Sequence, residues 1–201
     1  MEIESWDDNK ILDYVEEKLK TIDLDVVRKD VIRERVPKYL YIQNNIEKDI
    51  DEEFIKNYAS YYTMKRRWAQ PWRRKKYFEI LVELLTGKLK KDFPSINRRM
   101  RDTIGSTTTL VYGSKLLATV LPNKYAPLDS FEMDFWNISK PSREEKENEI
   151  YDKYCRIVDQ LVNSQTAIQL GAWFNEKFPQ FTQLPLIKKI DIIIWQFRAN
   201  V

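Results

Sequence analysis

The 201-residue chain contains no histidine, one cysteine and four glycines. Without histidine, Ser-His-Asp and Cys-His catalysis and all histidine-ligated metal sites are excluded. The single cysteine, Cys155, excludes an internal disulfide and a cysteine-ligated zinc site. The glycine patterns of Walker and Rossmann phosphate loops are absent as well. We therefore expect neither a metal nor a cofactor.

Long hydrophobic runs are also lacking. The most apolar stretch, Ile190 to Phe197, is too short to cross a bilayer and contains Asp191. Residues 1–8 are acidic and have neither the basic nor the apolar part of a signal peptide. Together with the single cysteine, these features predict a cytoplasmic protein with no membrane partner.

Helical periodicity dominates the sequence, and no useful strand alternation interrupts it. We predict an all-α fold, a compact bundle of about eight helices forming a single domain over residues 1–201. A helix over Val26 to Val36 is expected to end or be interrupted at Pro37. A long amphipathic helix is expected over Asp49 to Trp68, and another helix is expected to start at Asp129.

Basic residues are concentrated in the middle of the chain. The formal net charge is only +3, yet the segment from Lys65 to Arg101 holds 13 Lys or Arg and three Asp or Glu. Lysine and arginine neutralise phosphates, while the interleaved Trp68, Trp72 and Tyr77 could stack on unpaired bases. The alternative is a solvated helix surface whose aromatics belong to the core. The DNA-binding interpretation assigns phosphate contacts to Lys65, Arg66, Arg67, Arg73, Arg74, Lys75, Lys76, Arg98 and Arg99.

A second group of residues carries possible chemistry. Residues 110–118, LVYGSKLLA, indicate a glycine-interrupted turn that opens an apolar helix and places Lys115 in apolar surroundings. Burial disfavours the charged ammonium and makes a lysine a usable amine nucleophile. Asp129 follows Pro127 at the predicted helix start. A carboxylate there could move protons or stabilise a sugar cation, so the pair suits imine chemistry at a deoxyribose carbon.

Gly113-Ser114-Lys115 followed by Pro127-Leu128-Asp129 resembles the catalytic stretch of the helix-hairpin-helix DNA glycosylases, especially their 8-oxoguanine glycosylase branch. The resemblance covers about 25 residues. It implies an all-α fold, base excision with strand nicking, and no required metal. It assigns Lys115 as the Schiff-base nucleophile and Asp129 as the activating carboxylate. In the same turn, Gly113 and Ser114 would bring the backbone close to a DNA phosphate.

The same run is also similar to that of small helical proteins of mobile elements, in which the Lys/Asp pair need not be catalytic. The alternative function is a non-catalytic helical protein of a phage or mobile element that binds nucleic acid or another protein. Asp129 would then be an N-cap worth about 1 kcal/mol. Lys115 would reach the surface with its amine or form a structural ion pair with Asp129.

Two further patterns have ordinary structural interpretations. Glu144, Glu145, Glu147 and Glu149 alternate with basic residues and predict a solvated helix face rather than a metal site. The C-terminal aromatic residues are expected to be core, with a homodimer face as the alternative: Trp173, Phe174, Phe178, Phe181 and Trp195.

Overall fold

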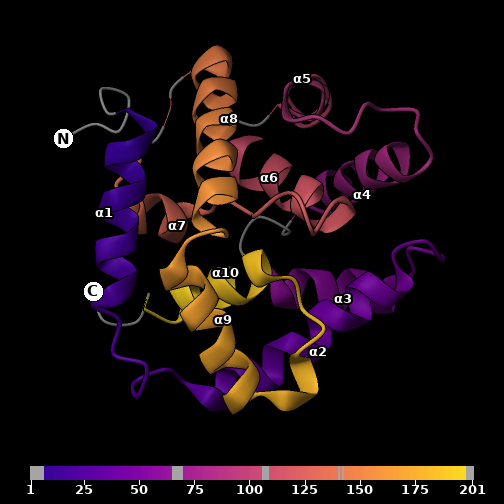
Figure 1. Cartoon of the computed structure of the whole chain (residues 1–201). Helices are drawn as coiled ribbons and strands as arrows, with labels where there is room; N and C mark the ends of the chain where they lie inside the picture. Colours follow the sequence, from indigo (N-terminus) through magenta and orange to yellow (C-terminus); the bar gives the residue numbers. More distant parts are fainter. Residues whose placement is uncertain (1–6, 65–69, 106–108, 140, 142, 198–201) are drawn as a thin grey trace.

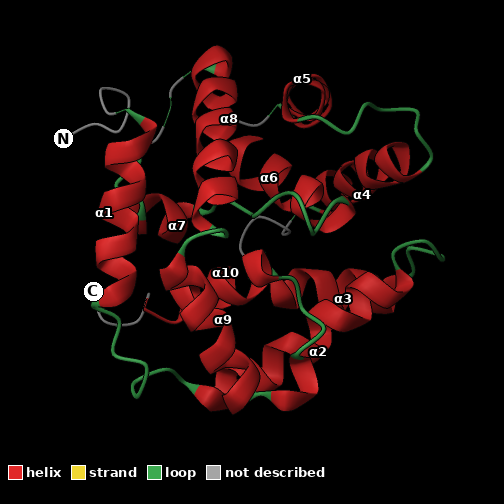
Figure 2. Ribbon diagram, in the orientation of Figure 1, coloured by secondary structure: helices red, strands yellow, loops and turns green. Residues whose placement is uncertain are grey.

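The computed structural model describes residues 7–64, 70–105, 109–139, 141 and 143–197, and within these ranges every regular element is helical (Figures 1 and 2). The all-α prediction is confirmed. The described residues form ten α-helices and a short 3-10 turn at Pro179–Phe181. The helices are α1 (Asp8–Lys20), α2 (Lys29–Asn45), α3 (Glu52–Tyr61), α4 (Pro71–Leu85), α5 (Phe93–Ile104), α6 (Thr109–Val120), α7 (Ser130–Phe135), α8 (Glu144–Leu161), α9 (Gln165–Lys177) and α10 (Leu186–Gln196).

The helices pack around α6, the most buried element of the bundle. Helices α4, α5 and α8 lie against α6, α1 lies beside α8, and the pairs α2 with α3 and α9 with α10 close the other side (Figure 1). Nine of the twelve residues of α6 are buried. Lys115 is one of these buried residues, so α6 places its charged side chain inside the molecule.

Helix starts follow the capping chemistry of the sequence. The side chains of Asp7, Asp51, Asp92 and Ser164 each accept a backbone N–H in the first turn of the helix that follows. Such caps satisfy amide groups that have no partner within the helix. Asp129 caps α7 in the same way, as the sequence predicts.

Two predicted helix ends are wrong. Helix α2 runs through Pro37 to Asn45, because Ile32, Val36, Tyr39 and Ile42 keep one buried apolar face across the proline. That packing offsets the lost hydrogen bond, which typically costs about 3 kcal/mol. The helix expected to reach Trp68 ends at Tyr61, and Thr63 then takes a left-handed φ of 53° that a helix cannot continue through.

The glycine-interrupted turn is also absent. Helix α6 is continuous through Gly113, which faces α5; an added Cβ would lie 3.0 Å from the Phe93 ring and 3.3 Å from Ile96. The glycine therefore permits close approach of two helices. Gly113 and Ser114 are both buried, Ser114 completely, so neither is placed to meet a DNA phosphate as expected.

The structure confirms the core interpretation for three of the C-terminal aromatic residues and contradicts the expected solvent exposure of one glutamate on α8. Phe174, Phe178 and Phe181 are buried, as the core interpretation predicts. Glu147 was expected on a solvated face and is instead buried, where its carboxylate accepts hydrogen bonds from Arg101 and Thr109. Glu147 lies on the same face of α8 as the buried Ile150, Tyr151 and Tyr154, so the helix directs it toward the core.

Candidate functional site

Lys115 and Asp129 lie together inside the bundle. Lys115 is 6% exposed, and its Nζ lies 3.7 Å from Asp129 Oδ2. The same ammonium donates a 3.1 Å hydrogen bond to the Tyr62 carbonyl at the end of α3. The structure thus brings together the two residues that the sequence singles out, whereas their chemical role stays a prediction.

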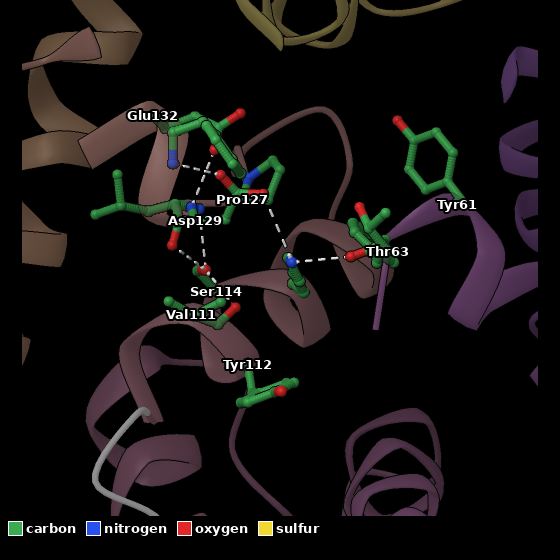
Figure 3. A network of polar contacts seen from close by, with 12 residues as sticks. Tyr61, Thr63, Val111, Tyr112, Ser114, Pro127, Asp129 and Glu132 are labelled. Atoms are coloured by element: carbon green, nitrogen blue, oxygen red, sulfur yellow. Dashed lines mark hydrogen bonds and ion pairs between the residues drawn. The ribbon is translucent and has the colours of Figure 1, made fainter. Parts of the chain in front are cut away.

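Asp129 is held by both ends of a capping box. Its Oδ1 accepts the N–H of Phe131 at 2.9 Å, and Glu132 Oε2 accepts the N–H of Asp129 at 3.1 Å (Figure 3). This arrangement fixes the carboxylate at the start of α7, where the partial positive charge of the helix favours an anion. The second oxygen, Oδ2, is the one directed toward Lys115.

The loop that carries Asp129 is anchored from two helices. Ser114 Oγ accepts the Leu128 N–H at 2.9 Å and lies 3.0 Å from the Val111 carbonyl, to which it donates (Figure 3). From α8, the Tyr151 hydroxyl donates to the Ala126 carbonyl at 3.0 Å, and the Tyr154 hydroxyl to the Pro127 carbonyl at 3.1 Å. These bonds set the position of Asp129 relative to α6, since the loop has no regular structure of its own.

A pocket of about 40 Å³ opens at the pair. Helices α2, α3, α6, α7 and α10 contribute to its walls, and its polar lining includes Arg35, Lys115, Asp129, Glu132 and Asp191. Roughly 10–15 Å³ suffices for one water, so this space takes a few water-sized groups. It is far smaller than the roughly 300–1,000 Å³ of pockets that enclose a whole small ligand.

Burial and neighbouring charges shift the pKa values of Lys115, Asp129 and Glu132. Burial lowers the pKa of Lys115, and the nearby Asp129 and Glu132 carboxyls offset this only in part. Burial also raises the pKa of Glu132 well above its usual range, reinforced by the charge of Asp129. For Asp129, burial is outweighed by the hydrogen bond from Glu132 and the charge of Lys115, so its pKa is lowered.

Three charged residues beside the pocket were missed by sequence reasoning. Lys188 Nζ pairs with Asp191 Oδ2 at 2.8 Å, and the Lys188 side chain is 1% exposed. The Arg35 guanidinium lies 3.5 Å from the ring centre of Trp195 and donates to the Tyr61 carbonyl. The spacing of Lys188 and Asp191 on one helix face was a usable signal. Nothing local in the sequence pointed to Arg35.

Six of the nine predicted phosphate-binding residues lie in the described ranges, four on α4 and two on α5. Lys65, Arg66 and Arg67 lie outside the described residues. Arg73, Arg74, Lys75 and Lys76 occupy the first two turns of α4, where Lys76 pairs with Glu79 at 2.7 Å. Arg99 makes two hydrogen bonds to Glu83, at 2.8 and 2.5 Å, and Arg98 lies 4.0 Å from Glu144.

Exposed cations remain at the start of α4. Arg74 and Lys75 are exposed and border an open groove of about 710 Å³ between α3 and α4, together with Phe78 and Val82. Trp72 is 51% exposed, and the Arg73 guanidinium lies 5.3 Å from its ring centre. The interpretation of Trp72 as a core aromatic is therefore wrong.

Comparison of the chain with protein-family models, with curated proteins and with solved structures found no match. Across the described ranges, no helix combines the length and apolar character that crossing a bilayer requires. Within the same ranges, no three acidic or cysteine side chains gather in a way that could hold a metal ion.

Proposed function

We propose that the protein binds DNA and acts on it as a base-excision glycosylase and abasic-site lyase, with Lys115 as the Schiff-base nucleophile. The observation that carries this proposal is the buried Lys115 amine, 3.7 Å from Asp129 at the wall of a pocket. Burial lowers the pKa of Lys115, which raises the fraction of neutral amine able to attack carbon.

The chemistry follows from the placement of the two side chains. On a nucleotide, the Lys115 nitrogen bonds to C1′ as the bond to the base breaks, and the base leaves with that electron pair. Asp129 offsets the positive charge that develops on the sugar. The C1′–O4′ bond then opens, O4′ takes a proton, and a protonated imine remains. Loss of a C2′ proton expels the 3′ phosphate and nicks the strand, and water releases the imine.

The size of the pocket favours an abasic site over a nucleotide that still carries its base. A space of about 40 Å³ accommodates the reacting sugar carbon and its oxygen but not a base as well. An abasic site already presents an aldehyde at C1′ and has no base to place. We therefore expect lyase activity on abasic DNA to exceed excision of any base.

Borohydride trapping on a duplex with an abasic site tests this function. Borohydride reduces the imine to a stable amine, so the wild-type protein should become covalently attached to DNA. Lys115→Met keeps the length of the side chain and should abolish the adduct. The control is Lys124→Ala, which removes an exposed lysine from the same loop and should trap normally. Trapping by Lys115→Met at the wild-type level would refute the assignment.

A second candidate function is non-catalytic binding of single-stranded nucleic acid. The observation that favours it is the half-exposed Trp72 beside Arg73, Arg74 and Lys75, since base stacking on an aromatic and phosphate contacts to cations act together in such proteins. Under this alternative, Lys115 and Asp129 are a structural ion pair. Gel shifts that need Trp72, with no covalent adduct under borohydride, would support it over the enzyme.

A further inference from the structure

Glu132 is a buried carboxyl group in direct contact with the proposed catalytic carboxylate. It lies in the first turn of α7, is 2% exposed, and lines the same pocket as Lys115 and Asp129. Its Oε2 accepts the Asp129 amide N–H at 3.1 Å (Figure 3), and a hydrogen bond between the two side chains also acts on the pKa of each. The resemblance to DNA glycosylases assigns no role to a residue at this position.

Charged groups of both signs surround Glu132, and the carboxylates of Asp129 and Asp191 act to raise its pKa. Asp129 stands on the preceding loop and Asp191 on α10, and the uncharged Tyr154 hydroxyl faces the group from α8. The cations around the cluster are Lys115 from α6, Arg35 from α2, and Lys188 from α10, whose ammonium pairs with Asp191. Two buried carboxyl groups in contact cannot both ionise without a large cost, so one of them retains a proton.

We propose that Asp129 and Glu132 hold one proton between them, and that Glu132, acting through Asp129, is a positioning residue that supplies this proton when Lys115 forms its imine. The inference rests on the proposed function and assigns the acid for that reaction. The directions of the two pKa shifts agree with it, because that of Glu132 is raised and that of Asp129 is lowered. The shared proton therefore resides mainly on Glu132.

The proton count balances through the reaction with an abasic aldehyde. The neutral Lys115 amine bonds to the carbonyl carbon, and a proton passes from nitrogen to oxygen to give the carbinolamine. The C–O bond then breaks, and the departing hydroxyl leaves as water with the proton of the carboxyl pair. The carboxyl pair changes from one negative charge to two while the lysine changes from neutral amine to cationic iminium. The total charge of the site is unchanged.

The structure supplies a conservative variant and a matched control. Glu132→Gln keeps the side-chain length and the capping bond to Asp129, because glutamine serves at this position of a capping box. It removes the exchangeable proton. Glu147 is also 2% exposed, but it lies on α8 and binds Arg101 and Thr109. Glu147→Gln therefore removes a buried carboxyl group from outside the pocket.

Infrared spectroscopy tests the shared proton without any substrate. At neutral pH the wild-type protein should show the C=O stretch of a protonated carboxyl group, which Glu132→Gln should lose and Glu147→Gln should retain. Asp129→Asn should shift the pH at which the band disappears to a lower value, since it removes the charge that holds the proton. A band that persists in Glu132→Gln, or no band in the wild type, would overturn the proposal.

Borohydride trapping tests the role of that proton in imine formation. We expect Glu132→Gln to trap abasic DNA on the order of 100-fold more slowly at neutral pH, the usual scale of general acid catalysis. Glu147→Gln should trap at the wild-type rate. Equal rates and pH profiles for wild type and Glu132→Gln would refute the proton-supply role. Failure of the wild type to trap refutes the proposed function instead, and the infrared result then still decides whether the proton is shared.

Discussion

Removal of the Ser114 hydroxyl isolates the contact that fixes the loop carrying Asp129. Ser114 Oγ accepts the Leu128 N–H at 2.9 Å, and Leu128 is the residue before Asp129. Both Ser114 and Leu128 are completely buried. In Ser114→Ala the Leu128 amide loses its acceptor while remaining inside the protein.

The cost of this change follows from burial. A buried N–H without a partner costs about 1–3 kcal/mol, more than the net value of an average exposed hydrogen bond. We expect Ser114→Ala to lower the free energy of unfolding by this amount. The control is Thr21→Ala, which removes an exposed hydroxyl that donates to the Lys18 carbonyl at 2.8 Å. Exposed changes of this kind usually stay within about 0.5 kcal/mol.

Urea unfolding followed by tryptophan fluorescence measures both variants, because the chain holds six tryptophans. The midpoint for Ser114→Ala should fall with an unchanged slope, and that for Thr21→Ala should stay near the wild type. A loss in Ser114→Ala no larger than that in Thr21→Ala would show that the hydroxyl does not anchor the loop. The account of how Asp129 is positioned would then be wrong.

Three further predictions concern pH, packing and DNA. Because the folded state raises the pKa of Glu132, its stabilising contribution is complete below the ordinary value of 4.5 and is lost as pH rises. Between pH 4.5 and the raised pKa of the folded state, the free energy of unfolding of Glu132→Gln should therefore increase relative to the wild type by about 1.4 kcal/mol per pH unit, as measured by urea unfolding. A difference that does not change with pH would contradict this. Gly113→Ala should lower the melting temperature, since the 3.0 Å contact of its new Cβ with an aromatic ring outweighs a helix-propensity gain of about 1 kcal/mol; a higher melting temperature would contradict the packing argument. Arg74→Ala should weaken the salt dependence of DNA binding by about one phosphate contact, a slope change of about 0.9, and Arg33→Ala, which removes an exposed cation from α2, should not. Equal slopes for the two variants would remove Arg74 from the interface.

Local capping and periodicity explain what could be predicted from the sequence. The N-cap at Asp129 and the inward faces of Phe54, Tyr58 and Phe174 follow from residue type and spacing alone. The interruptions expected at Pro37 and Gly113 were wrong for one physical reason. Tertiary packing of a continuous apolar face outweighs the local preference of a single residue.

The rest of the site depends on helix packing that no local pattern encodes. Arg35, Lys115 and Asp191 come from α2, α6 and α10, and only the packed bundle brings them to one pocket. Glu132 was locally recognisable as the third residue after an N-cap. Its burial against Asp129 was not, because that depends on how α7 packs against α6 and α10.

The most direct test of the central claim is to locate the covalent bond. The wild-type protein is incubated with abasic duplex and borohydride, the DNA is digested, and the protein is cleaved into peptides for mass spectrometry. We predict one modified lysine, Lys115, and no modification in Lys115→Met. An adduct distributed over exposed lysines such as Lys124, or an adduct that survives in Lys115→Met, would contradict the account.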